Sequence, residues 1–287
     1  MLTPFSDGGQ VDESRTAALI EFLLERRVAG LFPLGTTGEG PLLTLDERRQ
    51  VAEWVVRHTA NRVPVIIHTG AITTAETLEL TRHAHEVGAD AVAIVPPYFY
   101  KLSDDALLEH YAAVARALPD FPIYLYHNPG VTPNHLTTDL VFRLAETFPN
   151  IIGLKDSSGA LATLFASRSL HDGRFNTASG PDGLILAAQA VGVDACVAGN
   201  ANYATELVVG LYDAARRGDL ETGRTLQAQL DAARRILGDG SDLSLFKAMC
   251  ARRGVPIGDV RPPLRPASAE RIEAAWRALA EAGITFA

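Results

Sequence analysis

Residues 63–95 read VPVIIHTGAITTAETLELTRHAHEVGADAVAIV, which is one complete strand–helix–strand repeat. An apolar run over Val63–His68 and a second over Ala91–Val95 have the β-branched composition of buried strands. Between them, Thr73-Thr-Ala-Glu76 has the form of a capping box, in which each side chain satisfies a free N–H at the start of a helix. Because the crossover is a helix, the two strands are expected to be parallel.

The same repeat recurs along the chain at intervals of roughly 25–30 residues, the length of one strand–helix unit. A second capping box, Thr44-Leu-Asp-Glu47, opens one of its helices, and Ser103-Asp-Asp opens another that runs to about Ala117. The predicted strands are Gly30–Leu34, Val63–His68, Ala91–Val95, Pro122–Tyr126, Ile151–Lys155, Phe175–Ser179 and Ala195–Gly199.

Parallel strands joined by right-handed helical crossovers form either an open doubly wound sheet or a closed barrel. The spacing stays even from Gly30 to Gly199, and no GxGxxG follows the first strand as a dinucleotide-binding fold would require. We therefore predict an α/β fold, a (β/α)8 TIM barrel. An eighth strand should precede a helix at Glu13–Arg27, yet only Met1-Leu2 stands before the turn at Thr3-Pro4-Phe5. The first strand is therefore expected to be truncated: either the barrel begins with a stub, or, as we expect, the true N-terminus lies upstream of Met1.

After Gly199 the strand patterns stop and helical patterns continue. They cover Asp219–Leu237, Leu243–Ala251 and Ala269–Ala282. This change predicts a barrel domain over residues 1–217 and a C-terminal helical extension over residues 218–287.

The composition excludes several functional classes. Of 287 residues 47% are hydrophobic, which rules out intrinsic disorder, and the net charge of -8 disfavours binding to nucleic acid. No apolar run reaches the ~20 residues of a membrane span, and the N-terminus lacks the features of a signal peptide. Cys196 and Cys250 form no CxxC or zinc-ligand spacing. We expect a cytoplasmic protein that binds neither nucleic acid nor a membrane.

Only three of the 26 basic residues are lysines, namely Lys101, Lys155 and Lys247. Lys155 alone ends a predicted strand, and active sites of such barrels lie at the carboxyl ends of the strands. A desolvated lysine there can lose its proton and attack a ketone to form an imine, which arginine cannot do. The alternative is a structural lysine that pairs with Asp156 at the rim of the barrel.

Two other strand ends carry hydroxyl groups. Thr36 and Thr37 lie in a glycine-rich loop whose hydroxyl and N–H groups could hold a carboxylate; the alternative is a tight turn without a ligand. Tyr126 ends its own strand and could relay protons beside Lys155, or could be a rim tyrosine bonded to the backbone. His68 is a weaker candidate, for which the alternative is a hydrogen-bonded histidine of the core. No histidine or cysteine spacing predicts a metal site.

Three motifs together, Gly35-Thr-Thr-Gly-Glu39, Leu125-Tyr-His-Asn-Pro129 and Gly153-Leu-Lys-Asp156, resemble the dihydrodipicolinate synthase / N-acetylneuraminate lyase superfamily of pyruvate-dependent aldolases. The resemblance covers nearly the whole chain. It implies that Lys155 forms the Schiff base, that Tyr126 and Thr36 relay protons, and that Thr36 and Thr37 bind the pyruvate carboxylate. It further implies that a backbone carbonyl at or near Val197 faces the site, that no metal or organic cofactor is needed, and that the protein is a homotetramer.

Two departures from the pattern bear on the substrate. In the family that this chain resembles, dihydrodipicolinate synthases carry an arginine five positions after the site tyrosine. This chain has Val131 at that position. The usual second tyrosine of a Tyr-Tyr pair, which enters the relay of a neighbouring subunit, is Phe99 here, so that Tyr100 or water would have to replace it. Gly-Glu-Gly-Pro41 and Arg261-Pro-Pro look more like 2-keto-3-deoxy-sugar-acid aldolases.

We therefore expect a lyase that makes or cleaves a C–C bond between pyruvate and an aldehyde on a 2-keto-3-deoxy sugar acid. The alternatives are a dehydratase of such an acid, a condensation of the dihydrodipicolinate synthase type, and a non-catalytic barrel that binds a 2-oxo acid.

Overall fold

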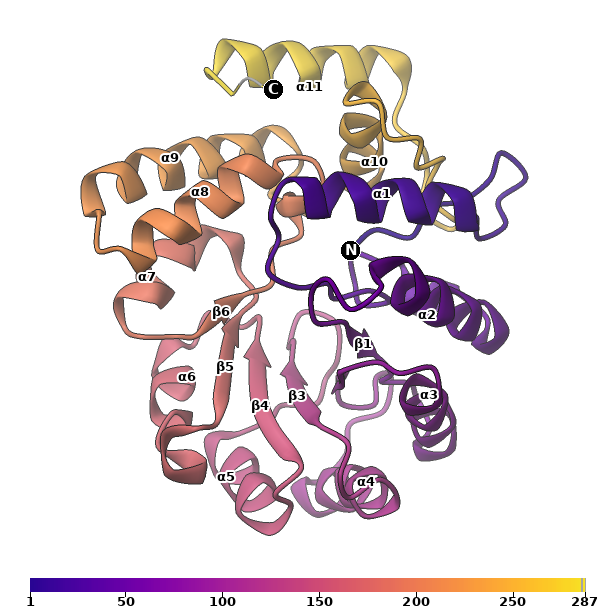
Figure 1. Ribbon diagram of the computed structural model, residues 1–287, viewed down its shortest axis with the longest axis vertical. Helices are drawn as coiled ribbons and strands as arrows, with labels where there is room; N and C mark the ends of the chain where they lie inside the picture. The colour runs from indigo at the N-terminus through magenta and orange to yellow at the C-terminus, as the bar shows by residue number, and fades with distance from the viewer. Residues whose placement is uncertain (285, 287) are drawn as a thin grey trace. The chain divides into compact units, whose positions relative to one another are not determined.

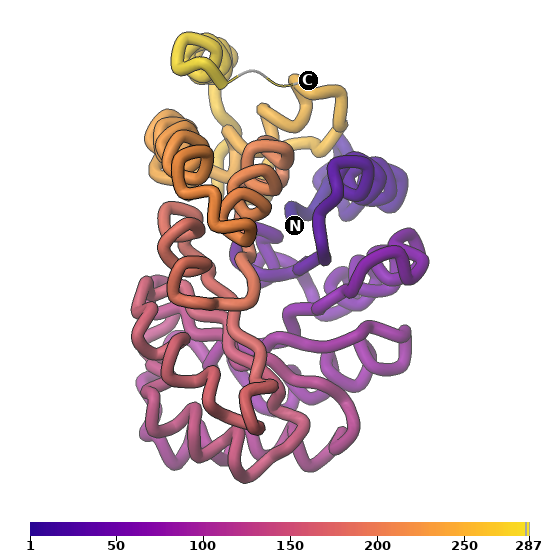
Figure 2. The backbone as a smooth tube through the Cα atoms, turned by 60° about the vertical axis from the view of Figure 1, so that its left-hand side comes forward, coloured from indigo at the N-terminus to yellow at the C-terminus, as the bar shows by residue number. Residues whose placement is uncertain are grey.

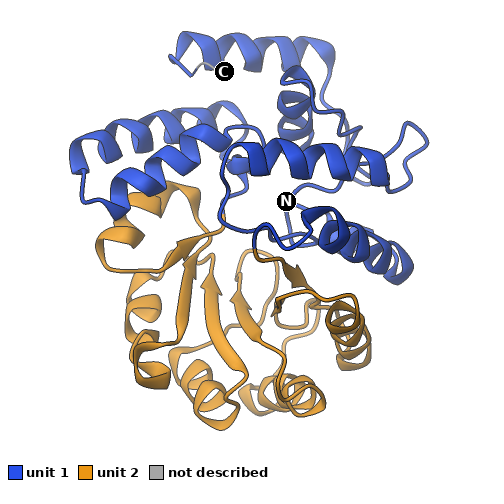
Figure 3. Ribbon diagram, in the orientation of Figure 1, with its two compact units in different colours: residues 1–63, 198–287 blue, residues 64–197 orange. Residues whose placement is uncertain are grey.

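The computed structural model describes residues 1–284 and 286, and the chain forms two compact units (Figure 3). Unit 2 is Pro64–Val197, and unit 1 combines Met1–Val63 with the segment from Ala198 onward. The domain boundary expected between residues 217 and 218 stays a prediction.

Unit 2 contains a parallel sheet whose strand order follows the chain, β1-β2-β3-β4-β5-β6. Helices α3 to α6 follow the outer side of this curved sheet (Figure 1). The strands are β1 Ile66–His68, β2 Ala91–Ile94, β3 Ile123–His127, β4 Ile151–Asp156, β5 Asn176–Ser179 and β6 Ala195–Cys196. The helices are α3 Thr74–Glu86, α4 Asp104–Ala117, α5 Thr138–Thr147, α6 Leu161–Ser167 and α7 Ile185–Ala190. The alternating parallel α/β pattern is confirmed.

The strand predicted at Gly30–Leu34 is wrong. Among residues 30–34 only Leu31 forms a β-bridge. Pro33 has no N–H to contribute to a ladder, and Leu34 has a left-handed backbone with φ of 64°, so an extended strand cannot continue. The sheet of the described residues consequently has six strands.

The truncated first strand is not confirmed either. Residues 1–4 form no strand, and Phe5 makes an isolated antiparallel bridge with Val11. These residues are nevertheless tightly held within unit 1. The Met1 amino group donates to the Phe32 carbonyl over 2.8 Å, and the Thr3 hydroxyl donates to the Gly38 carbonyl over 2.6 Å.

Unit 1 is helical, and helices α8 and α9, orange in Figure 2, pack side by side. Its helices are α1 Glu13–Glu25, α2 Leu45–Thr59, α8 Thr205–Arg216, α9 Leu220–Ile236, α10 Leu243–Arg252 and α11 Ala269–Glu281. The three helices predicted after residue 218 therefore form with nearly the expected bounds. The Thr44–Glu47 capping box is complete. At Thr73 only half of one forms, because the Glu76 carboxylate accepts from the Thr73 hydroxyl.

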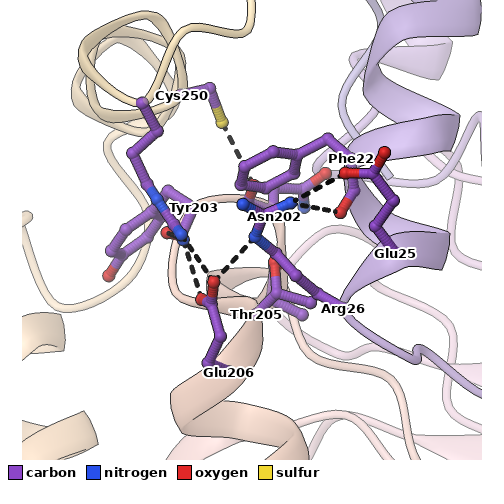
Figure 4. Close-up of polar contacts among 10 residues, drawn as sticks. Phe22, Glu25, Arg26, Asn202, Tyr203, Thr205, Glu206 and Cys250 are labelled. Atoms are coloured by element: carbon purple, nitrogen blue, oxygen red, sulfur yellow. Dashed lines mark hydrogen bonds and ion pairs between the residues drawn. The ribbon is translucent and has the colours of Figure 1, made fainter. Parts of the chain in front are cut away.

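Charged contacts join α1, α8 and α10 inside unit 1 (Figure 4). Arg26, just beyond α1, donates to Glu206 of α8 over 2.7 Å, and Arg253, just beyond α10, donates to the same carboxylate over 2.6 Å. Beside them the Cys250 thiol donates to the Asn202 carbonyl over 3.3 Å. Burial raises the pKa of Cys250 to about 12, so this thiol is a packing group rather than a nucleophile.

Candidate active site

The register of β3 and β4 brings the two principal candidates together. Tyr126 pairs with Lys155, and the next pair along is His127 with Asp156. Since successive side chains of a strand point to opposite faces, Tyr126 and Lys155 share one face of the sheet. Lys155 Nζ lies 3.8 Å from the centre of the Tyr126 ring, within the range of a cation–π contact. The prediction that these two side chains are neighbours is confirmed.

Both side chains are removed from water. Lys155 is 7% exposed and Tyr126 is 3% exposed. In β4, Lys155 comes directly after Gly153 and Leu154, and Leu154 is fully buried. A lysine amine in such surroundings is the kind of group that can act as a nucleophile toward a carbonyl carbon.

Asp156 lies on the opposite face of β4 from Lys155. Its carboxylate accepts from His127 Nδ1 over 2.8 Å, and it also accepts from the backbone N–H of Ser158 over 2.7 Å. The alternative in which Lys155 serves mainly to pair with Asp156 is therefore disfavoured, because the aspartate is engaged elsewhere.

Gly153 is required one layer below Lys155. A Cβ at this position would lie 2.5 Å from the Tyr124 ring and 2.6 Å from the Asn176 carbonyl oxygen. The absent side chain allows the Tyr124 ring to fill the interior between β3 and β5. Tyr124 donates to Asn176 Oδ1 over 3.1 Å, and this closes the layer beneath the candidate site.

Asn128 is a site residue that the sequence analysis missed. Its amide Nδ2 donates to the Tyr126 hydroxyl oxygen over 3.0 Å. The signal was present, because residues two apart along an extended chain lie on one face. The ring of His68 also meets Tyr126 edge-on, with the ring centres 5.7 Å apart, so this weaker candidate does lie beside the tyrosine.

Val197 follows β6, and its N–H donates to the Ser179 carbonyl over 2.9 Å. This bond extends the ladder of β5 and β6 by one residue, since Ser179 already pairs with Cys196. A role for a carbonyl near Val197 in the site stays a prediction. Burial raises the pKa of Cys196 to about 12, so a thiolate nucleophile at this strand end is disfavoured.

Thr36 and Thr37 belong to unit 1, where they occupy a compact turn. The N–H groups of Gly38 and Gly40 both donate to the Gly35 carbonyl, over 3.1 and 3.2 Å. Thr36 is exposed and Thr37 is half-buried. The turn is thus able to present a hydroxyl group, and the binding of a carboxylate by these threonines stays a prediction.

The same turn ends in a buried carboxylate. Glu39 has a left-handed φ of 54° and forms an ion pair with Lys247 over 2.7 Å. Lys247 also donates to the Asp259 carbonyl over 2.9 Å, and the N–H of Arg261 donates to Glu39 over 2.8 Å. Of the three lysines singled out by composition, Lys247 therefore has a structural role inside unit 1.

The loop after β2 presents two aromatic side chains to solvent. Phe99 is 79% exposed with a φ of 84°, and Tyr100 is 67% exposed. Their loop is held by Asn134, whose Nδ2 donates to the carbonyls of Pro97 and Tyr100 over 2.6 and 2.8 Å. The backbone of the loop that carries these exposed rings is therefore held in place on unit 2.

The part of the chain that the structure describes holds neither a metal-binding cluster nor a helix that could span a membrane. No group of three or more His, Cys, Asp or Glu side chains in residues 1–284 and 286 is arranged to hold a metal ion. Over the same residues, every helix is too short or too polar to cross a bilayer.

The chain resembles known proteins over nearly its whole length. Residues 1–282 match the model of the Dihydrodipicolinate synthetase family. A 4-hydroxy-tetrahydrodipicolinate synthase of Bartonella bacilliformis is 35% identical over 284 residues, covering 99% of this chain and 96% of the relative. An uncharacterized DapA-like lyase of Halobacterium salinarum is 38% identical over 265 residues, covering 92% of this chain and 86% of the relative.

Solved structures agree with this likeness. YagE, a prophage protein of Escherichia coli K12 belonging to the dihydrodipicolinic acid synthase family and solved in complex with pyruvate, matches with a TM-score of 0.92 at 31% identity, covering 99% of this chain and 97% of that one. The chloride-inhibited dihydrodipicolinate synthase of Acinetobacter baumannii, also with pyruvate, matches with a TM-score of 0.91 at 32% identity, with coverage of 99% and 97%.

The protein is therefore an enzyme of the class I lyases and aldolases, which work through a lysine Schiff base. Within that class the chain belongs to the dihydrodipicolinate synthetase family, whose members are pyruvate-dependent.

Proposed function

We propose that this enzyme cleaves or forms the C–C bond of a 2-keto-3-deoxy sugar acid through an imine between Lys155 and the 2-oxo group. The observation that carries the proposal is the contact between Lys155 and the ring of Tyr126, which places a buried amine beside a phenol. The complexes of YagE and of the Acinetobacter baumannii synthase with pyruvate support pyruvate as the 2-oxo acid.

The groups proposed for the site account for each bond and each proton of the reaction. The Lys155 amine attacks C2 of the oxo acid, and loss of water leaves a protonated imine. Removal of a proton from the C4 hydroxyl then breaks the C3–C4 bond, its electron pair enters the imine, and an aldehyde departs. The resulting enamine takes a proton at C3, and water releases pyruvate from Lys155. Tyr126 and Thr36 carry the protons in this scheme, and Thr36 and Thr37 hold the carboxylate.

Val131 supports a sugar-acid substrate over the partner of a dihydrodipicolinate synthase. The side chain is 46% exposed and has no charge with which to hold a carboxylate on the incoming aldehyde. The synthase names of relatives such as the Bartonella bacilliformis protein favour the condensation reaction as a second candidate. The dehydratase shares the same imine and would differ in expelling a hydroxyl group.

A product test separates these functions. The enzyme is incubated with a 2-keto-3-deoxy sugar acid, and the products are resolved by mass spectrometry. Equal amounts of pyruvate and aldehyde support the proposal, whereas a dehydrated oxo acid identifies a dehydratase.

Further properties are proposed for the fold, the assembly and the surroundings of the enzyme. We expect a closed (β/α)8 barrel, a homotetramer, no metal or organic cofactor, and a location in the cytoplasm. The exposed rings of Phe99 and Tyr100 support association between subunits, since a subunit contact would cover them.

A further inference from the structure

Two tyrosines on the inner face of β3 make hydrogen bonds of opposite polarity. The Tyr124 hydroxyl donates its proton to Asn176 Oδ1 over 3.1 Å. The Tyr126 hydroxyl oxygen instead accepts a proton from Asn128 Nδ2 over 3.0 Å. The first arrangement favours the neutral phenol, and the second favours the deprotonated form, because a donor stabilises a developing negative charge on oxygen.

The backbone turn after β3 holds Asn128 in place. The N–H of Val131 donates to the Asn128 carbonyl over 3.1 Å, which closes a turn with Pro129 and Gly130 at its centre. Proline sets the backbone angle at the first central position of such a turn. A Cβ on Gly130 would lie 3.5 Å from Asn128 Oδ1, so the glycine borders the amide on the side away from its Nδ2 donor.

The donor also controls where the proton of Tyr126 points. With Asn128 Nδ2 on the phenol oxygen, the hydroxyl hydrogen must be directed to another acceptor. Lys155 Nζ lies 3.8 Å from the centre of the same ring, on the side of the site where the imine is proposed. The amide donor of Asn128 therefore favours a phenol that gives up its proton readily toward the reacting centre.

We propose that Asn128 is a positioning residue that orients the Tyr126 hydroxyl and stabilises its deprotonated form, so that Tyr126 can shuttle protons during the lyase reaction. The inference rests on the proposed function for its catalytic consequence. Its physical core, the polarity of the hydrogen bond, can be tested without any substrate.

The test is a pH titration of the full-length protein labelled with ¹³C at the tyrosine ζ carbon, with Tyr126→Phe used to assign the Tyr126 signal. Asn128→Leu removes the donor while keeping the side-chain shape, and Asn128→Asp replaces the donor with a carboxylate oxygen. The titration midpoint of Tyr126 should rise by about half to one pH unit in Asn128→Leu. It should rise further in Asn128→Asp, because a negative charge opposes a second one.

Asn176→Ala is the matched control, since it removes an asparagine bonded to the neighbouring tyrosine. It should alter the signal of Tyr124 and leave the midpoint of Tyr126 in place. A Tyr126 midpoint that is equal or lower in both Asn128 variants overturns the inference. A merely structural role for Asn128 would not produce the ordered rise from wild type through leucine to aspartate.

The catalytic consequence is measured as exchange of the pyruvate methyl protons with solvent deuterium. In Asn128→Leu the exchange kcat should fall about three- to tenfold with little change in KM, and its pH optimum should move upward. Failure of wild type to form an imine would contradict the proposed function alone. An imine in wild type with unchanged titration and exchange in the Asn128 variants would contradict the role of Asn128 alone.

Discussion

Lys247 and Glu39 form an ion pair of 2.7 Å whose two side chains are 2% and 0% exposed. Burial lowers the pKa of Lys247, and the charge of Glu39 acts in the opposite direction to keep the lysine protonated. The pair joins the turn that carries Thr36 and Thr37 to helix α10, and Glu39 also accepts the N–H of Arg261. This buried contact links the predicted carboxylate-binding turn to the C-terminal segment of unit 1.

Replacing Lys247 with methionine should destabilise the protein by about 3–5 kcal/mol, because Glu39 is then left buried without its counter-charge. Urea unfolding measures the change. The double variant Lys247→Met/Glu39→Gln should recover part of the lost free energy of unfolding. A single-variant cost below about 1 kcal/mol would show that the pair contributes little, as exposed pairs do.

The burial of His110 predicts that the stability of the protein depends on pH. Burial lowers the pKa of His110 from 6.5 to about 4, and its Nδ1 lies 2.9 Å from the Thr74 hydroxyl. Between pH 6.5 and 4 the unfolded chain takes up a proton that the folded imidazole does not. The stabilising contribution is therefore complete above pH 6.5 and is lost as the pH falls toward 4, a change of about 3 kcal/mol.

The variant His110→Asn keeps a polar atom near Thr74 without a group that titrates in this range. Its free energy of unfolding should fall less steeply with acid than that of wild type between pH 6.5 and 4. Parallel stability curves for the two proteins would refute the assignment.

The sequence predicted much of unit 2, because alternating apolar runs and capping signals repeat evenly there. The strand predicted at Gly30–Leu34 failed for a local reason: Pro33 and the left-handed Leu34 break an otherwise apolar run. Apolar content alone cannot distinguish a buried strand from a buried irregular segment.

The candidate site, too, could be predicted from the sequence only in part. Strand ends and motif order pointed to Lys155 and Tyr126, and the register of β3 with β4 places them side by side. The partner of Lys247 could not be predicted, because Glu39 lies in a distant part of the chain. Glu39 also has a left-handed backbone conformation, which the sequence did not indicate. Asn128 was predictable in principle from its two-residue spacing to Tyr126.

Gly153→Ala should destabilise the protein by about 1–3 kcal/mol, since the added methyl group would overlap the Tyr124 ring. Thermal unfolding is the measurement. Gly8→Ala is the matched control, because a Cβ there has only an ordinary contact of 3.7 Å with the Ser6 hydroxyl. Equal melting temperatures for Gly153→Ala and wild type would mean that Tyr124 can move aside freely.

Val131→Arg should alter the choice of aldehyde. The new guanidinium should raise kcat/KM about tenfold for an aldehyde that carries a carboxylate, through a charge-assisted hydrogen bond. Val131→Leu, which adds bulk without charge, should give no such gain. The two variants are compared in the condensation direction with pyruvate, and an equal response to both aldehyde classes would contradict the assigned role of position 131.

Borohydride reduction in the presence of pyruvate tests the central claim most directly. Intact-mass and peptide mass spectrometry should find a single reduced pyruvate adduct, located on the peptide that carries Lys155. Lys155→Arg should give no adduct and no turnover, while Lys101→Arg should behave as wild type. A folded wild-type protein without an adduct, or with the adduct on Lys101 or Lys247, would contradict the account.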